Sequence, residues 1–258
     1  MNDPHVKYLI YKLKLDKNIS FDKPPALKEV YQVFEITLEN DLLTVEMRDH
    51  FAEEAKARRV VDPFIKCWEL DIALTQGRRE VQFEFVTAEI IDRNPSTPGQ
   101  SQTIEAGAGM IAITGFEAIV QVTRKNYPRP PRQLSYTPDV ESLWKRYEGY
   151  LDGREPLMSM AYFCLSLLQS STKGRANAAS IYKVDPQVLD KLGELTSERG
   201  DKSEARKLDR SSTLTPLTGP EISWIQEALK TLIRRKSEFD FDPNANLSLI
   251  TLSSLPTI

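Results

Sequence analysis

The sequence predicts an α+β protein in which a β-rich N-terminal domain with one helical excursion precedes an all-α helical bundle. Two observations support this prediction. Apolar residues mainly alternate with polar ones in the first half, as in strands, and recur every three or four positions in the second half, as in helices. A proline-rich segment separates the halves. We therefore predict a β-rich domain at 1–125, a Pro-rich basic linker at 126–137, a helical bundle at 138–236 and a tail at 237–258.

The first half contains a predicted β-hairpin. Lys7–Leu15 alternates loosely and predicts the first strand. Tyr31–Leu38 and Leu42–Met47 are β-prone runs, and they are joined by Asn40-Asp41, two residue types that favour tight turns. These runs therefore predict two neighbouring antiparallel strands.

The helical excursion is predicted at Phe51–Leu74, where apolar residues share one helical face. Asp62-Pro63 interrupts it. This pair either kinks one helix or begins a second one, with Asp62 as the N-cap and Pro63 in the first turn. The apolar face consists of Val61, Phe64, Ile65, Trp68 and Ile72.

A second β-rich region is predicted after this helix. In Arg79–Asp92 the apolar set changes phase by one residue after Phe85, which predicts a β-bulge or burial of both faces. A loop over Arg93–Gln102 and one or two strands over Met110–Val122 complete the domain.

Helical periodicity dominates beyond the linker. Thr137-Pro138 predicts an N-cap and a first turn. Pro156–Gln169 is apolar almost all round, which is typical of a helix at the centre of a bundle. Two short helices follow, at Arg175–Tyr182 and Pro186–Thr196.

The last predicted helix begins with a capping box at Thr218-Gly219-Pro220-Glu221. We expect it to end at Arg234-Arg235-Lys236, because positive charge is favourable at a helix C-terminus. The tail contains one apolar run, Leu247–Leu252, which predicts either a peripheral strand or a disordered segment.

Composition limits the classes of function. The net charge of −3 gives no overall field that would attract nucleic acid or a membrane, so any basic binding site is local. Cys67 and Cys164 are predicted to be buried free thiols, as suits a cytoplasmic protein. We find no secretory signal and no apolar run long enough for a membrane span, and we expect no cofactor.

The chain lacks a recognisable catalytic set. It has two histidines, and we interpret His50 as a solvated cap before a helix rather than as part of a metal or acid–base cluster with Glu53 and Glu54. No nucleophile elbow, Walker-type phosphate loop or dinucleotide-binding glycine motif is present. We therefore favour a protein that is not an enzyme.

A basic, aromatic-containing segment spans the predicted linker. Extended segments of this kind grip single-stranded nucleic acid by charge and stacking, and the alternative is a solvated linker. The candidate contact residues are Arg124, Lys125, Arg129 and Arg132, interleaved with Tyr127 and Tyr136.

The segment from Ala178 to Leu189 resembles the helix-turn-helix pattern of DNA-binding regulators. It has paired alanines, an aromatic residue, a turn residue and branched apolar residues at that spacing. The second helix carries Asp185, Asp190 and Glu194 against one lysine, and this charge opposes phosphate binding. We favour the alternative, two packed helices of the bundle.

A charged corner is predicted at Leu189–Arg210, where six acids balance six bases. Its arginines and lysines, in particular Arg199, Arg206 and Lys207, are candidate contact residues for nucleic acid or a protein partner.

About residues 138–236 resemble the HEPN-type helical domains of bacterial defence and toxin systems. The likeness rests on a long apolar helix (MSMAYFCLSLLQ), a short helix pair, a charged corner (LTSERG) and a capped closing helix (EISWIQEALKTLIRR). The family's ribonuclease motif places a histidine after an arginine. Arg199 matches the arginine, but no histidine follows. The resemblance therefore implies binding or dimerisation rather than RNA cleavage.

The first half, notably FIKCWELDIAL and FEFVTAEIIDRNP, resembles uncharacterised bacterial proteins, which implies no function. We expect a non-enzymatic interaction or scaffold module with a protein partner, in a bacterial defence or toxin-related complex. The alternative is a nucleic-acid-binding protein or a divergent HEPN-type ribonuclease. Self-association remains open, and no membrane association is expected.

Overall fold

The computed structural model describes residues 3–76, 80–94, 122–199 and 215–258. The chain divides into two compact units, Met1–Pro131 and Arg132–Ile258. The first contains an antiparallel five-stranded sheet with one helix, and the second contains five packed helices, so the predicted α+β class is confirmed. The boundary between the units falls within the predicted linker.

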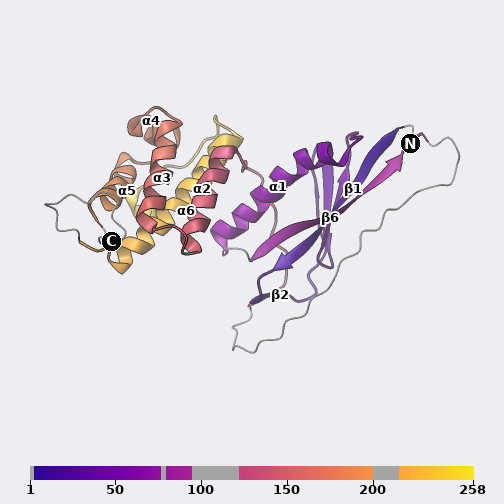
Figure 1. Cartoon of the computed structure of the whole chain (residues 1–258), viewed down its shortest axis with the longest axis horizontal. Coiled ribbons are helices and arrows are strands. Elements are labelled where there is room, and N and C mark those ends of the chain that lie inside the picture. Colours follow the sequence, from indigo (N-terminus) through magenta and orange to yellow (C-terminus); the bar gives the residue numbers. More distant parts are fainter. Residues whose placement is uncertain (1–2, 77–79, 95–121, 200–214) are drawn as a thin grey trace. The chain divides into compact units, whose positions relative to one another are not determined.

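The N-terminal unit is built on a sheet of strand order β3-β4-β5-β1-β6, in which every neighbouring pair is antiparallel (Figure 1). A separate parallel pair joins β2 to β7. Apart from Val122, the strands predicted at Met110–Val122 lie outside the described residues. The strands are β1 Pro4–Leu15, β2 Ile19–Phe21, β3 Leu27–Val30, β4 Phe34–Glu39, β5 Leu42–Met47, β6 Val81–Asp92 and β7 Val122–Arg124.

The predicted hairpin is confirmed as β4 and β5. Its two turn residues, Asn40 and Asp41, have φ angles of 51° and 60°. Two consecutive positive φ angles define the tight turn whose twist matches that of the flanking strands, and Asn and Asp tolerate this conformation.

A single helix, α1 (Glu54–Thr75), lies against the sheet (Figure 1). It runs through Pro63, so the Asp62-Pro63 pair does not begin a second helix. Its predicted apolar face packs on the sheet, and the ring of Trp68 lies 4.7 Å from that of Phe83. Tyr11 of β1 donates a hydrogen bond of 2.8 Å to Asp62. The helix and sheet therefore share one core.

The phase change in β6 is a β-bulge. Ile10 pairs with Thr87 and Tyr11 pairs with Phe85, so Val86 is the extra residue between them. This confirms the first of the two predicted alternatives. Because the bulge shifts the alternation by one residue, both Phe85 and Ala88 pack against the core.

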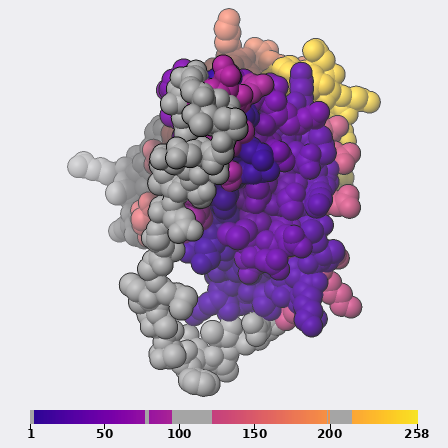
Figure 2. Space-filling view, turned by 90° about the vertical axis from the view of Figure 1, so that its right-hand side faces the viewer, coloured from indigo at the N-terminus to yellow at the C-terminus, as the bar shows by residue number. Residues whose placement is uncertain are grey.

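The sheet face turned away from α1 is more polar. Buried residues alternate along β4 and β5, so Glu35, Thr37, Thr44 and Glu46 take the intervening positions. The surface of this unit is drawn in indigo and purple in Figure 2. Within the described residues a helix covers one face of the sheet, which suits an antiparallel sheet whose other face is more polar.

The two histidines meet at the start of β1. The rings of His5 and His50 stack with centroids 5.4 Å apart, and His50 lies 3.6 Å from the carboxylate of Asp3. Burial, with the positive charges of Arg93 and His50, lowers the pKa of His5 below its usual 6.5. The folded state therefore favours neutral His5.

We predict that acidification weakens the N-terminal unit through His5. Because its pKa is lower in the folded state, the stabilisation is complete above pH 6.5 and is lost as the pH falls through the folded-state pKa. Urea unfolding at about pH 7.5 and about pH 5.5 should show a larger loss of stability for the wild type than for His5→Gln. Equal losses would contradict this role for His5.

The described part of the C-terminal unit contains five α-helices. Thr137 caps α2 by accepting a hydrogen bond from the Val140 backbone, and Thr218 and Glu221 form the predicted capping box of α6. Both predicted helix starts are therefore confirmed. The helices are α2 Pro138–Leu151, α3 Leu157–Ser170, α4 Arg175–Ile181, α5 Pro186–Glu198 and α6 Gly219–Phe241.

The end of α6 differs from the prediction. The helix continues to Phe241, and Arg235 and Lys236 are buried, with 5% and 6% of their surfaces exposed. With the fully buried Ser237, they form what we call the α6 polar cluster. Buried charges require partners, and these partners hold the extra helical turn in place.

Arg235 joins α6 to the end of α4. Its guanidinium donates to the backbone carbonyls of Tyr182 at 2.8 Å and Lys183 at 3.1 Å, and to the Glu238 carboxylate at 3.1 Å. The last carbonyls of a helix lack partners within the helix, so Arg235 supplies donors where α4 ends.

Lys236 and Ser237 join α6 to the beginning of α2. The Lys236 ammonium contacts both oxygens of Asp240 at 2.6 Å and lies 3.3 Å from Asp139. The Ser237 hydroxyl donates to the Ser135 carbonyl at 2.8 Å, and the Ser135 amide donates back to the Ser237 carbonyl at 3.1 Å. These bonds attach the segment before α2 to the bundle.

The chain beyond α6 returns to the corner between α4 and α5. Ile250 forms a parallel β-bridge with Val184. Its amide donates to Lys183 at 2.9 Å, and its carbonyl accepts from Asp185 at 2.8 Å. The apolar run of the tail is therefore a peripheral extended segment, which a short 3₁₀ helix, η1 (Leu252–Ser254), follows. Within the described ranges, no helix is both long and apolar enough to cross a membrane.

We predict that Arg235→Met lowers the free energy of unfolding by about 3 kcal/mol, because it leaves the buried carbonyl of Tyr182 without its donor and removes one of the two donors to the Lys183 carbonyl. Arg234→Met on the same helix is the matched control. Arg234 is 37% exposed and pairs with Glu238 at 3.3 Å, so its loss should cost only about 0.5 kcal/mol. Urea denaturation followed by circular dichroism measures both. Equal losses of unfolding free energy in the two variants would show that the buried contacts of Arg235 add no more stability than an exposed ion pair.

Candidate functional site

The corner between α4 and α5 is the starting point of the site. Lys183 adopts a left-handed conformation with φ of 52°, which turns the chain sharply after α4. The Val184 amide donates to Ala179 at 2.9 Å, and Asp185 caps α5 by accepting from the Gln187 amide at 2.9 Å. With the bonds from Arg235 and Ile250, this corner is held on several sides.

The inner faces of α4 and α5 form the packed helix pair that the sequence indicated. The paired alanines, the aromatic residue and the branched apolar residues of the pattern are all buried, and α4 and α5 both pack against α3. The buried set is Ala178, Ala179, Tyr182, Val184, Val188, Leu189 and Leu192.

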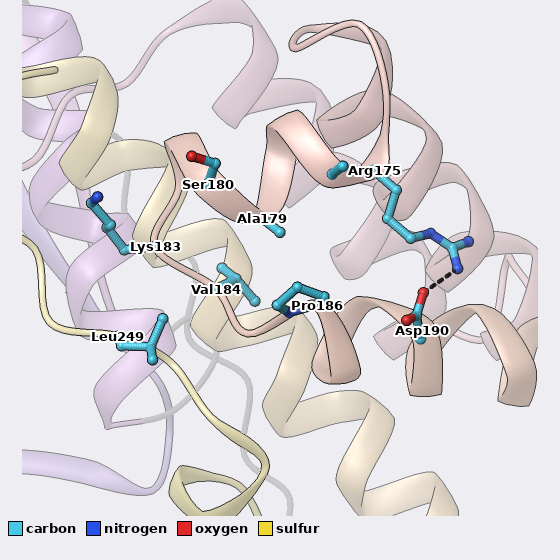
Figure 3. Close-up of a pocket in the computed structure, with 9 residues that line it drawn as sticks. Arg175, Ala179, Ser180, Lys183, Val184, Pro186, Asp190 and Leu249 are labelled. Atoms are coloured by element: carbon cyan, nitrogen blue, oxygen red, sulfur yellow. Dashed lines mark hydrogen bonds and ion pairs between the residues drawn. The ribbon is translucent and has the colours of Figure 1, made fainter.

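On the outside of this pair lies a hollow of about 580 Å³, which we call the α4–α5 groove (Figure 3). This volume lies within the range typical of ligand pockets. Residues of both helices, the corner and the tail line it. They are Arg175, Ala176, Ala179, Ser180, Lys183, Val184, Pro186, Asp190 and Leu249.

One end of the groove is closed by an ion pair. Arg175 lies 2.8 Å from the carboxylate of Asp190, so α4 and α5 are bridged there (Figure 3). Gly193 makes room for this arginine, because a Cβ at that position would lie 2.7 Å from the guanidinium. The two charges compensate each other.

The other end carries an exposed cation and an exposed apolar side chain. Lys183 and Leu249 lie there, on the corner and on the tail (Figure 3). Leu249 is 58% exposed, although the neighbouring Ile250 is buried and bonded to the corner. The groove therefore has an exposed apolar side chain and an exposed cation at the same end.

The outer surface of α5 does not suit nucleic acid. Asp190 and Glu194 are exposed, and Lys191 lies 3.0 Å from Glu194 and so is neutralised. Asp190 is paired with Arg175, so this surface of α5 offers a phosphate backbone no unpaired cation among its described side chains.

The basic residues of the predicted linker belong to two different units. Arg124 ends β7 and forms an ion pair with Glu80, while Lys125 and Arg129 are exposed in the N-terminal unit. Arg132 is exposed in the C-terminal unit. Tyr127, one of the two tyrosines interleaved with these basic residues, is buried, which the sequence pattern did not indicate.

Tyr127 packs into the core of the N-terminal unit. It is 6% exposed, its ring lies 4.8 Å from that of Phe21, and its hydroxyl accepts a hydrogen bond of 3.3 Å from the Asp41 amide. A buried ring cannot stack on a base, so the linker loses one of the two aromatic contacts proposed for it.

Arg199 has a structural role at the base of the charged corner. It lies 2.9 Å from the carboxylate of Glu221, and it forms an isolated parallel bridge with Thr215. Glu221 is itself engaged in the capping box of α6. Arg206 and Lys207 lie outside the described residues.

The two candidate basic residues of the C-terminal unit that the structure describes, Arg132 and Arg199, do not lie at one place. Arg199 is tied to Glu221 at the start of α6, whereas the segment after Arg132 is tied to Ser237 near its end. At 1.5 Å per residue, these two anchors are about 24 Å apart along the helix.

Groups suited to metal binding or nucleophilic chemistry are scarce in the described part of the chain. No three His, Cys, Asp or Glu side chains there converge as a metal site requires. Cys164 is buried in α3, and burial raises the pKa of its thiol to about 12. A thiol with this pKa is an inert core residue rather than a nucleophile.

The helix-turn-helix spacing was the one sequence signal for the groove, because it marks the α4–α5 pair. The hollow on the outer side could not be predicted from this spacing. One of its walls is Leu249, which lies far from α4 and α5 in the sequence. In comparisons with known proteins, no family model, no curated protein and no solved structure matches this chain.

We predict that Arg199 and Glu221 are energetically coupled. Hydrogen bonds from Thr218 and the charge of Arg199 lower the pKa of Glu221, so the ion pair should persist at neutral pH and weaken as Glu221 is protonated in acid. A double-mutant cycle with Arg199→Ala and Glu221→Ala should give a coupling energy of about 1 kcal/mol at pH 7 and less in acid. Additive effects at pH 7 would show that Arg199 is not held by this pair.

Proposed function

We propose that this protein is a non-enzymatic interaction module whose C-terminal unit binds a partner protein through the α4–α5 groove. The observation that carries the proposal is Leu249, which is 58% exposed beside a groove with an apolar floor. Isolated exposed aliphatic residues are ordinary, but one fixed at the rim of a hollow offers surface that a partner can bury.

The groove is also supported at both ends by ordered contacts. The Arg175–Asp190 pair bridges one end, and the bonds of Arg235 and Ile250 hold the other. A site that is formed before binding loses less conformational entropy when the partner arrives. The groove therefore has the rigidity expected of a binding surface.

The biological setting that we propose is a bacterial defence or toxin-related complex. The resemblance of the helical half to HEPN-type domains supports it, and the missing histidine favours binding over cleavage. Arg199 pairs with Glu221, which is consistent with a structural role for this arginine rather than a catalytic one.

We predict that Ala176→Trp abolishes partner binding. Ala176 is exposed and lines the groove, so an indole there fills the hollow without disturbing the core. Tagged full-length protein should retain a specific partner from its own cells after nuclease treatment and a high-salt wash, and Ala176→Trp should retain at least about tenfold less. Ala55→Trp, at an exposed position on α1, is the matched control.

A partner that is retained equally by Ala176→Trp would place the interaction elsewhere on the protein. The second candidate function is nucleic-acid binding or a divergent ribonuclease activity, which the exposed Lys125 and Arg129 favour. In that case nuclease treatment removes the retained material, and the amount retained falls steeply as the salt concentration rises.

A further inference from the structure

We infer that the α4–α5 groove takes a partner segment with one aliphatic side chain beside one carboxylate, and that Lys183 is the cation that pairs with the carboxylate. This inference rests on the proposed function and specifies the chemistry of the partner. It follows from how charge and apolar surface are distributed in the groove.

The charges of the groove lining do not balance. Arg175 and Asp190 neutralise each other at one end. At the other end Lys183 is exposed, and no ion pair joins it to another described residue. One positive charge is therefore left for a ligand, and a single ammonium suits a single carboxylate.

The position of Lys183 is fixed by its backbone. Its carbonyl accepts hydrogen bonds from Arg235 at 3.1 Å and from the Ile250 amide at 2.9 Å. The side chain therefore extends from a fixed point at the groove end, which reduces the entropy lost on pairing.

Apolar surface lies next to this cation. Ala179 and Val184 are nearly fully buried in the lining, and Leu249 stands exposed at the same end as Lys183 (Figure 3). An aliphatic side chain placed there would bury the exposed surface of Leu249, which is favourable. The groove thus offers an apolar contact and a cation at the same end.

A polyanion fits this arrangement poorly. Arg175 is paired with Asp190, so Lys183 is the one cation of the described groove lining left for a ligand, and a run of phosphates would find no second cation there. A short acidic and aliphatic protein segment is therefore favoured over nucleic acid.

The test uses three capped peptides, Ac-Ala-Leu-Ala-Asp-Ala-NH2, its asparagine analogue and its analogue with alanine in place of leucine. Amide chemical shifts of the full-length protein report binding. We expect saturable shifts at groove amides such as Ala176, Lys183 and Leu249 with the first peptide. Affinity should fall about fivefold with either analogue, because each lacks one of the two contacts.

Lys183→Glu should lower the affinity for the aspartate peptide by about fivefold or more. The affinity for the asparagine peptide should stay unchanged. Lys173→Glu is the matched control, since Lys173 is also exposed with a positive φ of 62° but does not line the groove. It should leave both affinities unchanged.

Two results would overturn the inference, namely groove amides that do not respond to the aspartate peptide, or aspartate and asparagine peptides that bind equally. In either case the proposed function still stands if Ala176→Trp loses the natural partner while Ala55→Trp keeps it. If Ala176→Trp keeps the partner, the proposed function fails by itself, so the two failures are distinguishable.

Discussion

The burial of charge at the end of α6 is the constraint on which the C-terminal unit depends. Arg235 and Lys236 would be very unfavourable inside the protein unless their donors were satisfied. Some of their acceptors come from distant parts of the chain, namely the carbonyls of Tyr182 and Lys183 at the end of α4 and the carboxylate of Asp139, and Asp240 on α6 itself adds another. Ser237 adds a bond to the segment before α2. One helical turn therefore determines where α2 begins and where α4 ends.

The groove follows from this constraint. Because Arg235 bonds the carbonyl of Lys183, the chain turns at a fixed point, and the same carbonyl accepts the Ile250 amide. The tail is thereby held beside the corner, with Leu249 at the groove rim. The positions of the exposed cation and the apolar rim are thus consequences of buried polar contacts on the inner side. The interaction proposed for the outer surface depends on them.

Local signals predicted most of the fold, and long-range pairing explains the rest. The Asn40-Asp41 turn, the bulge in β6 and the capping box of α6 each follow from a few neighbouring residues, and the structure has all three. The end of α6 was predicted wrongly because Arg235 and Lys236 resemble an exposed basic terminus when their partners are not known. The groove was out of reach of sequence reasoning for the same reason, since no local pattern links Leu249 to α4.

Native-state hydrogen exchange of the Ile250 and Asp185 amides tests most directly whether the α6 polar cluster unites corner and tail. If it does, both amides exchange only in large openings, with a free energy close to that of unfolding the C-terminal unit. Their protection should then match that of amides in the interior of α6. Exchange at nearly the rate of an unstructured chain, as expected for the terminal Ile258, would show that the tail is held only weakly, and it would contradict the account of how the groove is formed.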